Sequence, residues 1–152
     1  MFMEARNILT PPSSNPKMAE TKTKIIASSV GRRREAVASV RLINGDAEMT
    51  VNDKPISVYF PGLEAKYRYE LPLKTVGLEA KYTATVMVHG GGKFGQLDAV
   101  ALGLARAIVQ VKKEYIKPLR DAGLMTRDSR TRQRRMVGMG GKSRRKKQSP
   151  KR

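Results

Sequence analysis

Hydrophobic and polar positions alternate along two stretches of this chain, as they do in half-buried β-strands. The first runs from Ala36 to Ile43, and the second and clearest runs from Glu79 to His89. Asn44-Gly45 follows the first stretch, and this dipeptide favours a type I′ turn because both central residues need a positive φ. We therefore expect a β-hairpin whose return strand is Glu48 to Asn52.

Helical spacing replaces alternation in the second half of the body. Between Gly95 and Lys113 the apolar residues recur every three or four positions. Small residues such as Gly103 lie among them and would let this helix approach a sheet closely. A shorter helix is predicted from Glu114 to Ala122, with Gly123 as the glycine that follows its end.

The segment between the hairpin and the second strand is less regular. Asp53 can cap a short helix with Pro55 in its first turn. Apolar residues four apart favour a further helix from Leu63 to Leu71, ending before Pro72. The order strand, strand, helix, strand, helix predicts an α+β sandwich. We divide the chain into a disordered extension at 1–24, a globular α+β domain at 25–125 and an extended basic tail at 126–152.

Charge is concentrated at the C-terminal end. The chain has 31 Lys and Arg against 13 Asp and Glu, a net charge of +18. Residues 127–152 hold twelve of the basic residues and a single acidic one, Asp128, which we expect to fold back onto neighbouring arginines. A segment with this composition buries too little apolar surface to order itself. It requires a large anionic partner, and nucleic acid gains affinity by releasing counterions from each neutralised phosphate.

The residue types that catalysis and metal binding need are scarce. The chain has no cysteine and one histidine, His89, for which a structural role is the better interpretation. The glycines at 90–92 before Lys93 fit neither a P-loop nor a dinucleotide fingerprint and predict a tight strand-to-helix turn. No apolar run approaches 18 residues. We expect no catalytic site, metal, cofactor or membrane partner.

Several motifs in order resemble one family, the small-subunit ribosomal protein nine family in its bacterial or organellar form. They include Gly31-Arg32-Arg33, Tyr59-Phe60-Pro61, Gly90-Gly91-Gly92, Thr126-Arg127-Asp128 and the terminal Lys151-Arg152. The resemblance covers residues 31–152. It departs from the family at the tip, where Ser149-Pro150 stands in place of the usual aromatic residue and serine.

The resemblance implies a βαβ fold with a left-handed crossover, like the second domain of ribosomal protein five, and a cytoplasmic location in the ribosome, an organellar ribosome being the alternative. It implies 16S-type ribosomal RNA, peptidyl-site tRNA and neighbouring head proteins of the small subunit as partners. The tRNA anticodon stem-loop would be contacted by Lys151 and Arg152. The expected rRNA-binding residues are Arg32, Arg33, Arg34, Arg127, Arg130, Arg132, Arg134, Arg135, Lys142, Arg144, Arg145, Lys146 and Lys147.

Two other functions fit parts of the sequence. A free-standing RNA chaperone would also need a basic tail, but it would bind RNA without fixed stoichiometry and would wash off in salt. An enzyme of the same fold superfamily would use a glycine-rich loop to bind nucleotide. The lack of a suitable base, metal ligand or intact phosphate loop argues against the enzyme.

Overall fold

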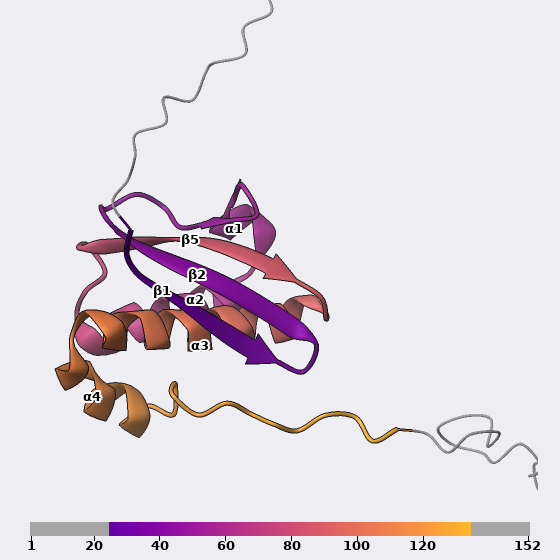
Figure 1. Cartoon of the computed structure of the whole chain (residues 1–152). Helices are drawn as coiled ribbons and strands as arrows, with labels where there is room; N and C mark the ends of the chain where they lie inside the picture. The colour runs from indigo at the N-terminus through magenta and orange to yellow at the C-terminus, as the bar shows by residue number, and fades with distance from the viewer. Residues whose placement is uncertain (1–24, 135–152) are drawn as a thin grey trace, which may run out of the picture.

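A computed structural model describes residues 25–134 of the chain, and the predictions for residues 1–24 and 135–152 lie outside them. The described part is a five-stranded sheet with the strand order β1-β2-β5-β3-β4, covered on one face by helices (Figure 1). The strands are β1 (Ile25–Arg33), β2 (Ala36–Asn44), β3 (Thr50–Val51), β4 (Lys54–Pro55) and β5 (Tyr82–His89). The helices are α1 (Ile56–Tyr59), α2 (Leu63–Val76), α3 (Lys93–Val111), the 3₁₀ turn η1 (Lys113–Tyr115) and α4 (Ile116–Asp121).

The sheet begins with a strand that the sequence pattern did not predict. β1 pairs antiparallel with β2 through the two-residue turn Arg34-Glu35, where Arg34 has a φ of 52°. The buried face of β1 consists of Ala27, Ser29 and Gly31. These residues are too small or too polar to stand out against their neighbours, so no hydrophobic alternation is visible in the sequence.

The hairpin predicted at Asn44-Gly45 is wrong. β2 pairs along its length with β5, from Val37 opposite His89 to Asn44 opposite Tyr82. The alternating β5 offers eight paired residues, whereas β3 has only two and lies parallel to β5 on its far side. The chain therefore leaves the sheet after β2 instead of turning back beside it.

The tight turn lies one element later. Asn52 and Asp53 have φ values of 48° and 63° and join β3 to β4, with Val51 opposite Lys54. Asp53 is therefore a turn residue and does not cap α1, whose N-cap is Pro55. Asn and Asp adopt left-handed φ more easily than other residues with a side chain, which explains why this pair can replace Asn-Gly.

Helix α2 confirms the helical interpretation of 63–71 but not its end. It continues through the buried Pro72 to Gly77, which ends it with a φ of 68°. A proline inside a helix removes one hydrogen bond. Here Pro72 and Leu73 lie in the core, so their burial offsets part of that loss. The predicted end failed because tertiary packing outweighed local propensity.

The long helix α3 packs closely against β1 and β2, as its small residues predicted. A Cβ at Gly31 would overlap the Ala99 carbonyl oxygen, and one at Gly103 would lie 2.6 Å from a Val40 methyl group. The Ser29 hydroxyl donates to the Gly103 carbonyl at 2.6 Å in this contact. Gly31 is therefore needed for the close approach of two backbones, and it sits beneath α3 rather than in a flexible hinge.

Two further predictions can be compared with the helices. The helix predicted from Glu114 is a 3₁₀ turn (η1) up to Tyr115, and α4 begins only at Ile116. Gly123 follows the end of α4 as expected, and the Gly123 and Leu124 N–H groups donate to the Arg120 and Leu119 carbonyls. Among residues 25–134, α3 is long and apolar enough to cross a membrane by composition, but half of it is buried in the domain, as in a core helix.

β3 and β5 are parallel and are connected through α1 and α2, which makes a βαβ unit within the mixed α+β fold. The left-handed crossover and the likeness to the second domain of ribosomal protein five stay predictions.

Candidate nucleic-acid interface

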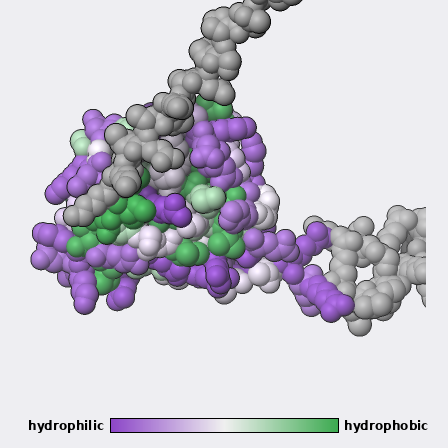
Figure 2. All heavy atoms as spheres, turned by 45° about the horizontal axis from the view of Figure 1, so that its top comes forward, coloured by the Kyte–Doolittle hydropathy of each residue, from purple (hydrophilic) through white to green (hydrophobic). Residues whose placement is uncertain are grey.

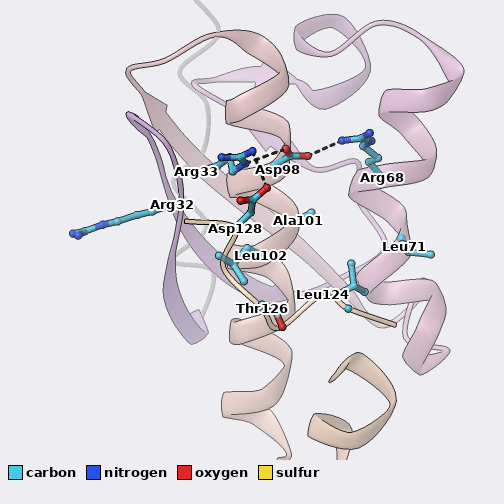
Figure 3. A pocket seen from close by; sticks show the side chains of 11 residues that line it. Arg32, Arg33, Arg68, Leu71, Asp98, Ala101, Leu102, Leu124, Thr126 and Asp128 are labelled. Atoms are coloured by element: carbon cyan, nitrogen blue, oxygen red, sulfur yellow. Dashed lines mark hydrogen bonds and ion pairs between the residues drawn. The ribbon is translucent and has the colours of Figure 1, made fainter. Parts of the chain in front are cut away.

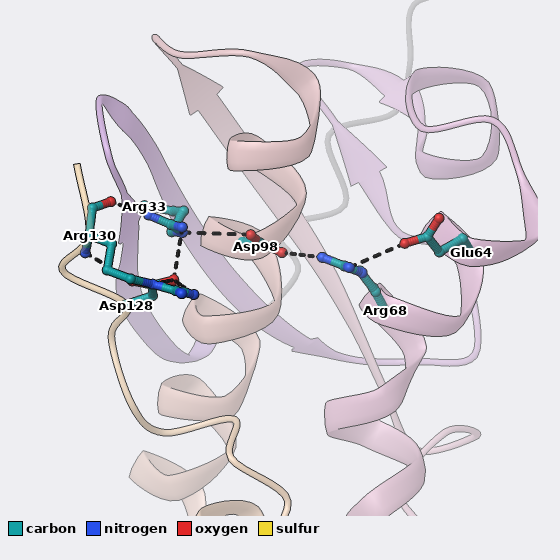
Figure 4. A network of polar contacts seen from close by, with 6 residues as sticks. All are labelled: Arg33, Glu64, Arg68, Asp98, Asp128 and Arg130. Atoms are coloured by element: carbon teal, nitrogen blue, oxygen red, sulfur yellow. Dashed lines mark hydrogen bonds and ion pairs between the residues drawn. The ribbon is translucent and has the colours of Figure 1, made fainter. Parts of the chain in front are cut away.

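Arg33 holds the start of the basic tail against the domain (Figure 4). Its Nη2 lies 2.8 Å from Asp128 Oδ2, and its Nη1 donates to the Arg130 carbonyl at 2.7 Å. Its Nε lies 3.7 Å from Asp98 Oδ2 on α3. The Arg33 side chain is only 12% exposed, because β1 directs it over α3 on the same face as Gly31. We call Arg33, Asp98, Asp128 and Arg130 the tail latch.

Asp128 accepts hydrogen bonds from both the backbone and the side chain of Arg130. Its Oδ1 accepts from the Arg130 backbone N–H at 2.9 Å, and its Oδ2 lies 2.8 Å from Arg130 Nη2. These bonds from the Arg130 guanidinium and N–H, with the charges of Arg130 and Arg33, hold the pKa of Asp128 well below its usual value. The expected folding of Asp128 onto neighbouring arginines is confirmed.

The latch is connected to α2 through a second arginine. Arg68 Nη1 donates to Asp98 Oδ1 at 2.7 Å, and its Nη2 lies 3.2 Å from Glu64 Oε1. Asp98 thus stands between Arg33 and Arg68 and bridges β1 to α2 from its place on α3. This alternation of charges lets each partly buried group keep a partner of opposite sign.

A cavity of about 260 Å³ lies beside the latch (Figure 3). Leu102 on α3 and Leu124 and Thr126 at the start of the tail form part of its wall. The tail therefore leaves the domain along α3, and the ion pairs of the latch follow directly after these apolar contacts.

The arginines predicted to bind rRNA differ in their surroundings. Arg32 is exposed and points away from the latch (Figure 3), and Arg34 is exposed in the β1–β2 turn. In the tail, Arg127, Arg132 and Arg134 are exposed, as is Arg130, whose side chain is nevertheless paired with Asp128. Arg33 alone among these described arginines is largely buried. Arg135, Lys142, Arg144, Arg145, Lys146, Lys147, Lys151 and Arg152 lie outside the described residues.

The glycine loop forms the expected tight turn between β5 and α3. Gly90 and Gly91 have φ values of 68° and 63°. A Cβ at Gly90 would lie 2.5 Å from the Glu35 carbonyl oxygen, and one at Gly91 would lie 3.0 Å from Ala36. The loop therefore packs directly on the β1–β2 turn and brings the start of α3 next to Arg34.

Phe94, in the first turn of α3, is a candidate that sequence reasoning missed. Its side chain is 74% exposed and lines a groove of about 540 Å³ together with Arg34, Lys93 and Arg132. No pattern in the sequence marked it, because Phe94 lies three residues before Leu97 and so continues the apolar stripe of α3 at helical spacing.

The described part of the chain offers little for metal or acid–base chemistry. Within residues 25–134, no three His, Asp or Glu side chains are grouped closely enough to hold a metal ion. His89 is exposed at the end of β5, on the face of the sheet opposite the helices. The two carboxylates of the latch, Asp98 and Asp128, are already paired with arginines.

Comparisons with known proteins agree with this basic, non-catalytic character. The family model described as Ribosomal protein S9/S16 matches residues 31–152. The small ribosomal subunit protein uS9 of Synechocystis sp. is 43% identical over 122 residues, covering 79% of this chain and 88% of the relative. The protein of the same name from Gloeothece citriformis is 44% identical with the same coverage. That from Thermus thermophilus is 43% identical over 108 residues, or 71% of this chain and 84% of the relative.

The matched region contains most of the folded domain and the whole tail, and the relatives are named as proteins of the small ribosomal subunit. The chain is therefore a ribosomal component of bacterial type, located in the cytoplasmic ribosome, and not an enzyme. It belongs to the S9 family of small ribosomal subunit proteins.

Proposed function

We propose that this chain binds 16S-type rRNA in the head of the small subunit, packs beside neighbouring head proteins and contacts the peptidyl-site tRNA with the end of its tail. The observation that supports this most strongly is the tail latch. Arg33 pairs with Asp128, the only carboxylate among residues 127–152. Beyond that point, the tail is cationic without interruption by acid, and it starts from a fixed place on the domain.

The length of the tail sets how it must act. The 17 residues from Met136 to Arg152 can span at most roughly 55 Å, at about 3.3 Å each. The Debye length is about 8 Å at physiological salt, so charges at the tip cannot act on a distant tRNA from the surface of the domain. The tail must be threaded to its target. Arg144, Arg145, Lys146 and Lys147 would neutralise rRNA phosphates on the way.

Lys151 and Arg152 are the residues we assign to tRNA. Contacts to phosphate position a ligand without reading its sequence, which suits a contact that every tRNA must make. Pro150 stands where the family usually has a serine. Proline fixes φ near −65° and biases the preceding residue toward extended geometry, so we expect this tip to approach tRNA differently from the tips of its relatives. The assignment rests on the position of these residues at the end of the family motif.

Sedimentation of the tagged chain with ribosomal particles after a high-salt wash tests the rRNA role. We expect one copy per small subunit to remain, because many phosphate contacts act together. If the chain washes off and follows bulk RNA, the RNA-chaperone interpretation replaces ours.

A separate measurement tests the tRNA role. Deleting Lys151-Arg152 should leave subunit assembly intact and speed the dissociation of peptidyl-site tRNA modestly. A matched variant with Arg144 and Arg145 replaced by glutamine should instead weaken retention of the chain itself. Unchanged tRNA dissociation from subunits carrying the deletion would refute the assignment of Lys151 and Arg152 and leave the rRNA role standing.

A further inference from the structure

We propose that the groove beside Phe94 takes an unstacked RNA base, which stacks on the Phe94 ring while Arg34, Lys93 and Arg132 hold the adjoining phosphates. This inference rests on the proposed rRNA-binding function and names one contact within it. Its partner is a single-stranded or bulged segment of RNA, because a base within a duplex has no free face to offer.

The exposure of Phe94 is the first observation. Phe94 is 74% exposed on a helix whose remaining apolar side chains are largely directed into the core. Replacing it with a polar residue would cost the fold little, so folding does not explain an aromatic ring at this position. A flat ring held on the first turn of a well-packed helix is the platform that base stacking requires.

The charge around the ring is the second observation. The groove has a volume of about 540 Å³, and its lining includes the cations Arg34, Lys93 and Arg132 against a single acidic side chain outside the latch, Glu35. They come from the β1–β2 turn, the start of α3 and the tail, three segments that the latch and the glycine loop hold together. Aromatic rings interleaved with cations are typical of surfaces that bind single-stranded nucleic acid.

The backbone of the groove adds to this surface. Gly91, Gly92 and Gly95 line it, so phosphates can approach the main chain without meeting side chains. Gly92 is the N-cap of α3 and provides no side-chain hydrogen bond to the first turn. The N–H groups at the start of α3 therefore need outside acceptors, and phosphate oxygens are suitable ones.

A protein partner is the competing occupant. Phe94 also borders a mainly apolar hollow of about 160 Å³ lined by Phe60, Pro61, Ala65, Lys93 and Leu97, into which an apolar side chain could fit. Arg34 and Arg132 line the groove and not this hollow, which favours RNA, and the groove continues into the basic tail through Thr131 and Arg132. We therefore assign the groove to RNA and let the experiment test the protein alternative.

The test uses the full chain added to small-subunit particles reconstituted from rRNA and the other subunit proteins. Phe94→Ala should weaken binding roughly five- to a hundredfold, as expected for one lost stacking contact. Phe94→Trp should restore binding, whereas Phe94→Leu should not. Leu63→Ala is the matched control, because Leu63 is an 87% exposed apolar residue outside the lining of the groove.

Salt dependence separates stacking from charge. Phe94→Ala should leave the slope of log K against log[salt] unchanged, whereas Arg132→Gln should lower it by about 0.7–0.9, as for one phosphate contact. Ultraviolet crosslinking of the assembled particle should attach a nucleotide to the peptide that contains Phe94.

Three outcomes would overturn the inference. The first is wild-type binding by Phe94→Ala. The second is a crosslink from Phe94 to a protein. The third is full rescue by leucine together with a loss of binding in Leu63→Ala, which would show apolar docking. If the wild-type chain itself fails to join the particle with fixed stoichiometry, the proposed function fails instead, so the two results are distinguishable.

Discussion

Replacing Arg33 with alanine should release the first residues of the tail, whereas the same change at Arg32 should leave them in place. These neighbours have the same charge and both were expected to bind rRNA. The structure directs them to opposite faces of β1, Arg33 over α3 and Arg32 away from it (Figure 3). A matched pair of variants therefore tests whether burial, rather than residue type, decides which arginine meets RNA.

The size of the effect follows from the contacts of Arg33. It forms an ion pair with the Asp128 carboxylate at 2.8 Å and donates a hydrogen bond to the Arg130 carbonyl at 2.7 Å, while Asp98 keeps its other partner, Arg68. One hydrogen bond from a charged group contributes about 1.5–3 kcal/mol, and an ion pair near the surface adds up to about 1 kcal/mol. Water can solvate the released tail, so we expect a net cost of about 2 kcal/mol, or about a thirtyfold shift toward the open latch.

Hydrogen exchange of the Arg130 amide measures this opening, because that N–H donates to Asp128 Oδ1 at 2.9 Å. Exchange should speed up by as much as thirtyfold in Arg33→Ala and stay as in the wild type in Arg32→Ala. Arg33→Lys should lie between them, because a single ammonium group cannot reproduce the forked geometry of guanidinium.

Binding to rRNA should show the reverse order. Arg32→Ala should lower the salt slope of binding by about 0.7–0.9, as one lost phosphate contact does, whereas Arg33→Ala should leave the slope unchanged. If the two variants gave the same exchange rates and the same salt slopes, the distinction between a latch residue and an RNA-binding residue would be refuted.

Three further predictions concern stability and pH. Gly31→Ala should lower the free energy of unfolding, measured by denaturant titration, by about 3 kcal/mol or more, because its Cβ would overlap backbone atoms of α3. Gly92→Ala should change the free energy of unfolding by less than about 1 kcal/mol, because a Cβ at Gly92 would have nothing within 4 Å. Asn52→Leu should cost about 2–3 kcal/mol, seen as a lower Tm, because the Asn52 amide bonds both the Val88 N–H at 2.8 Å and the Val88 carbonyl at 3.0 Å. Because the pKa of Asp128 is lowered in the folded state, the latch should be stable at neutral pH and should open as the pH falls below the ordinary carboxyl value of 3.8. Hydrogen exchange of the Arg130 amide, corrected for its intrinsic pH dependence, should show this opening. The Asp128→Asn variant should lose the pH dependence.

The sequence predicted those elements whose apolar pattern is strong. β2, β5, α3 and α4 follow from alternation or helical spacing, and the glycine loop and Gly123 follow from local turn chemistry. β1 was not predicted because Gly31 and Ser29, on its buried face, make close contacts with α3 but are not hydrophobic. Small residues at a close contact give no hydrophobic alternation in the sequence, so their role becomes visible only in the packing of the facing helix.

Strand pairing was the part that local signals could not determine. Asn44-Gly45 is a strong hairpin signal, yet β2 pairs with β5, which lies about forty positions later in the chain. A turn motif sets the local conformation, whereas pairing depends on how much matched surface a distant strand offers. The same limit applies to Pro72, where burial in α2 outweighed its local tendency to end a helix.

The candidate interface divides in a similar way. Composition located the basic tail and predicted that Asp128 would fold back, because the arginines around it lie close in sequence. It could not show that Arg33 takes part, since 95 positions separate Arg33 from Asp128. Phe94 was missed for the opposite reason, since an exposed aromatic residue breaks no pattern and becomes noticeable only when its surroundings are known.

The latch also gives a role to the acidic residue at the base of the tail that we propose to bind RNA. A carboxylate facing phosphates would repel them, and Asp128 is the only acid among residues 127–152. Arg33 and Arg130 neutralise the Asp128 carboxylate at the edge of the domain. Its ion pairs fix the base of the tail, and its charge should therefore not repel RNA phosphates from the rest of the tail. The position of Arg33 depends in turn on Gly31, which lets β1 lie against α3 closely enough to bring the guanidinium over Asp98. The packing of the core and the direction of the tail are therefore determined by the same contact between β1 and α3.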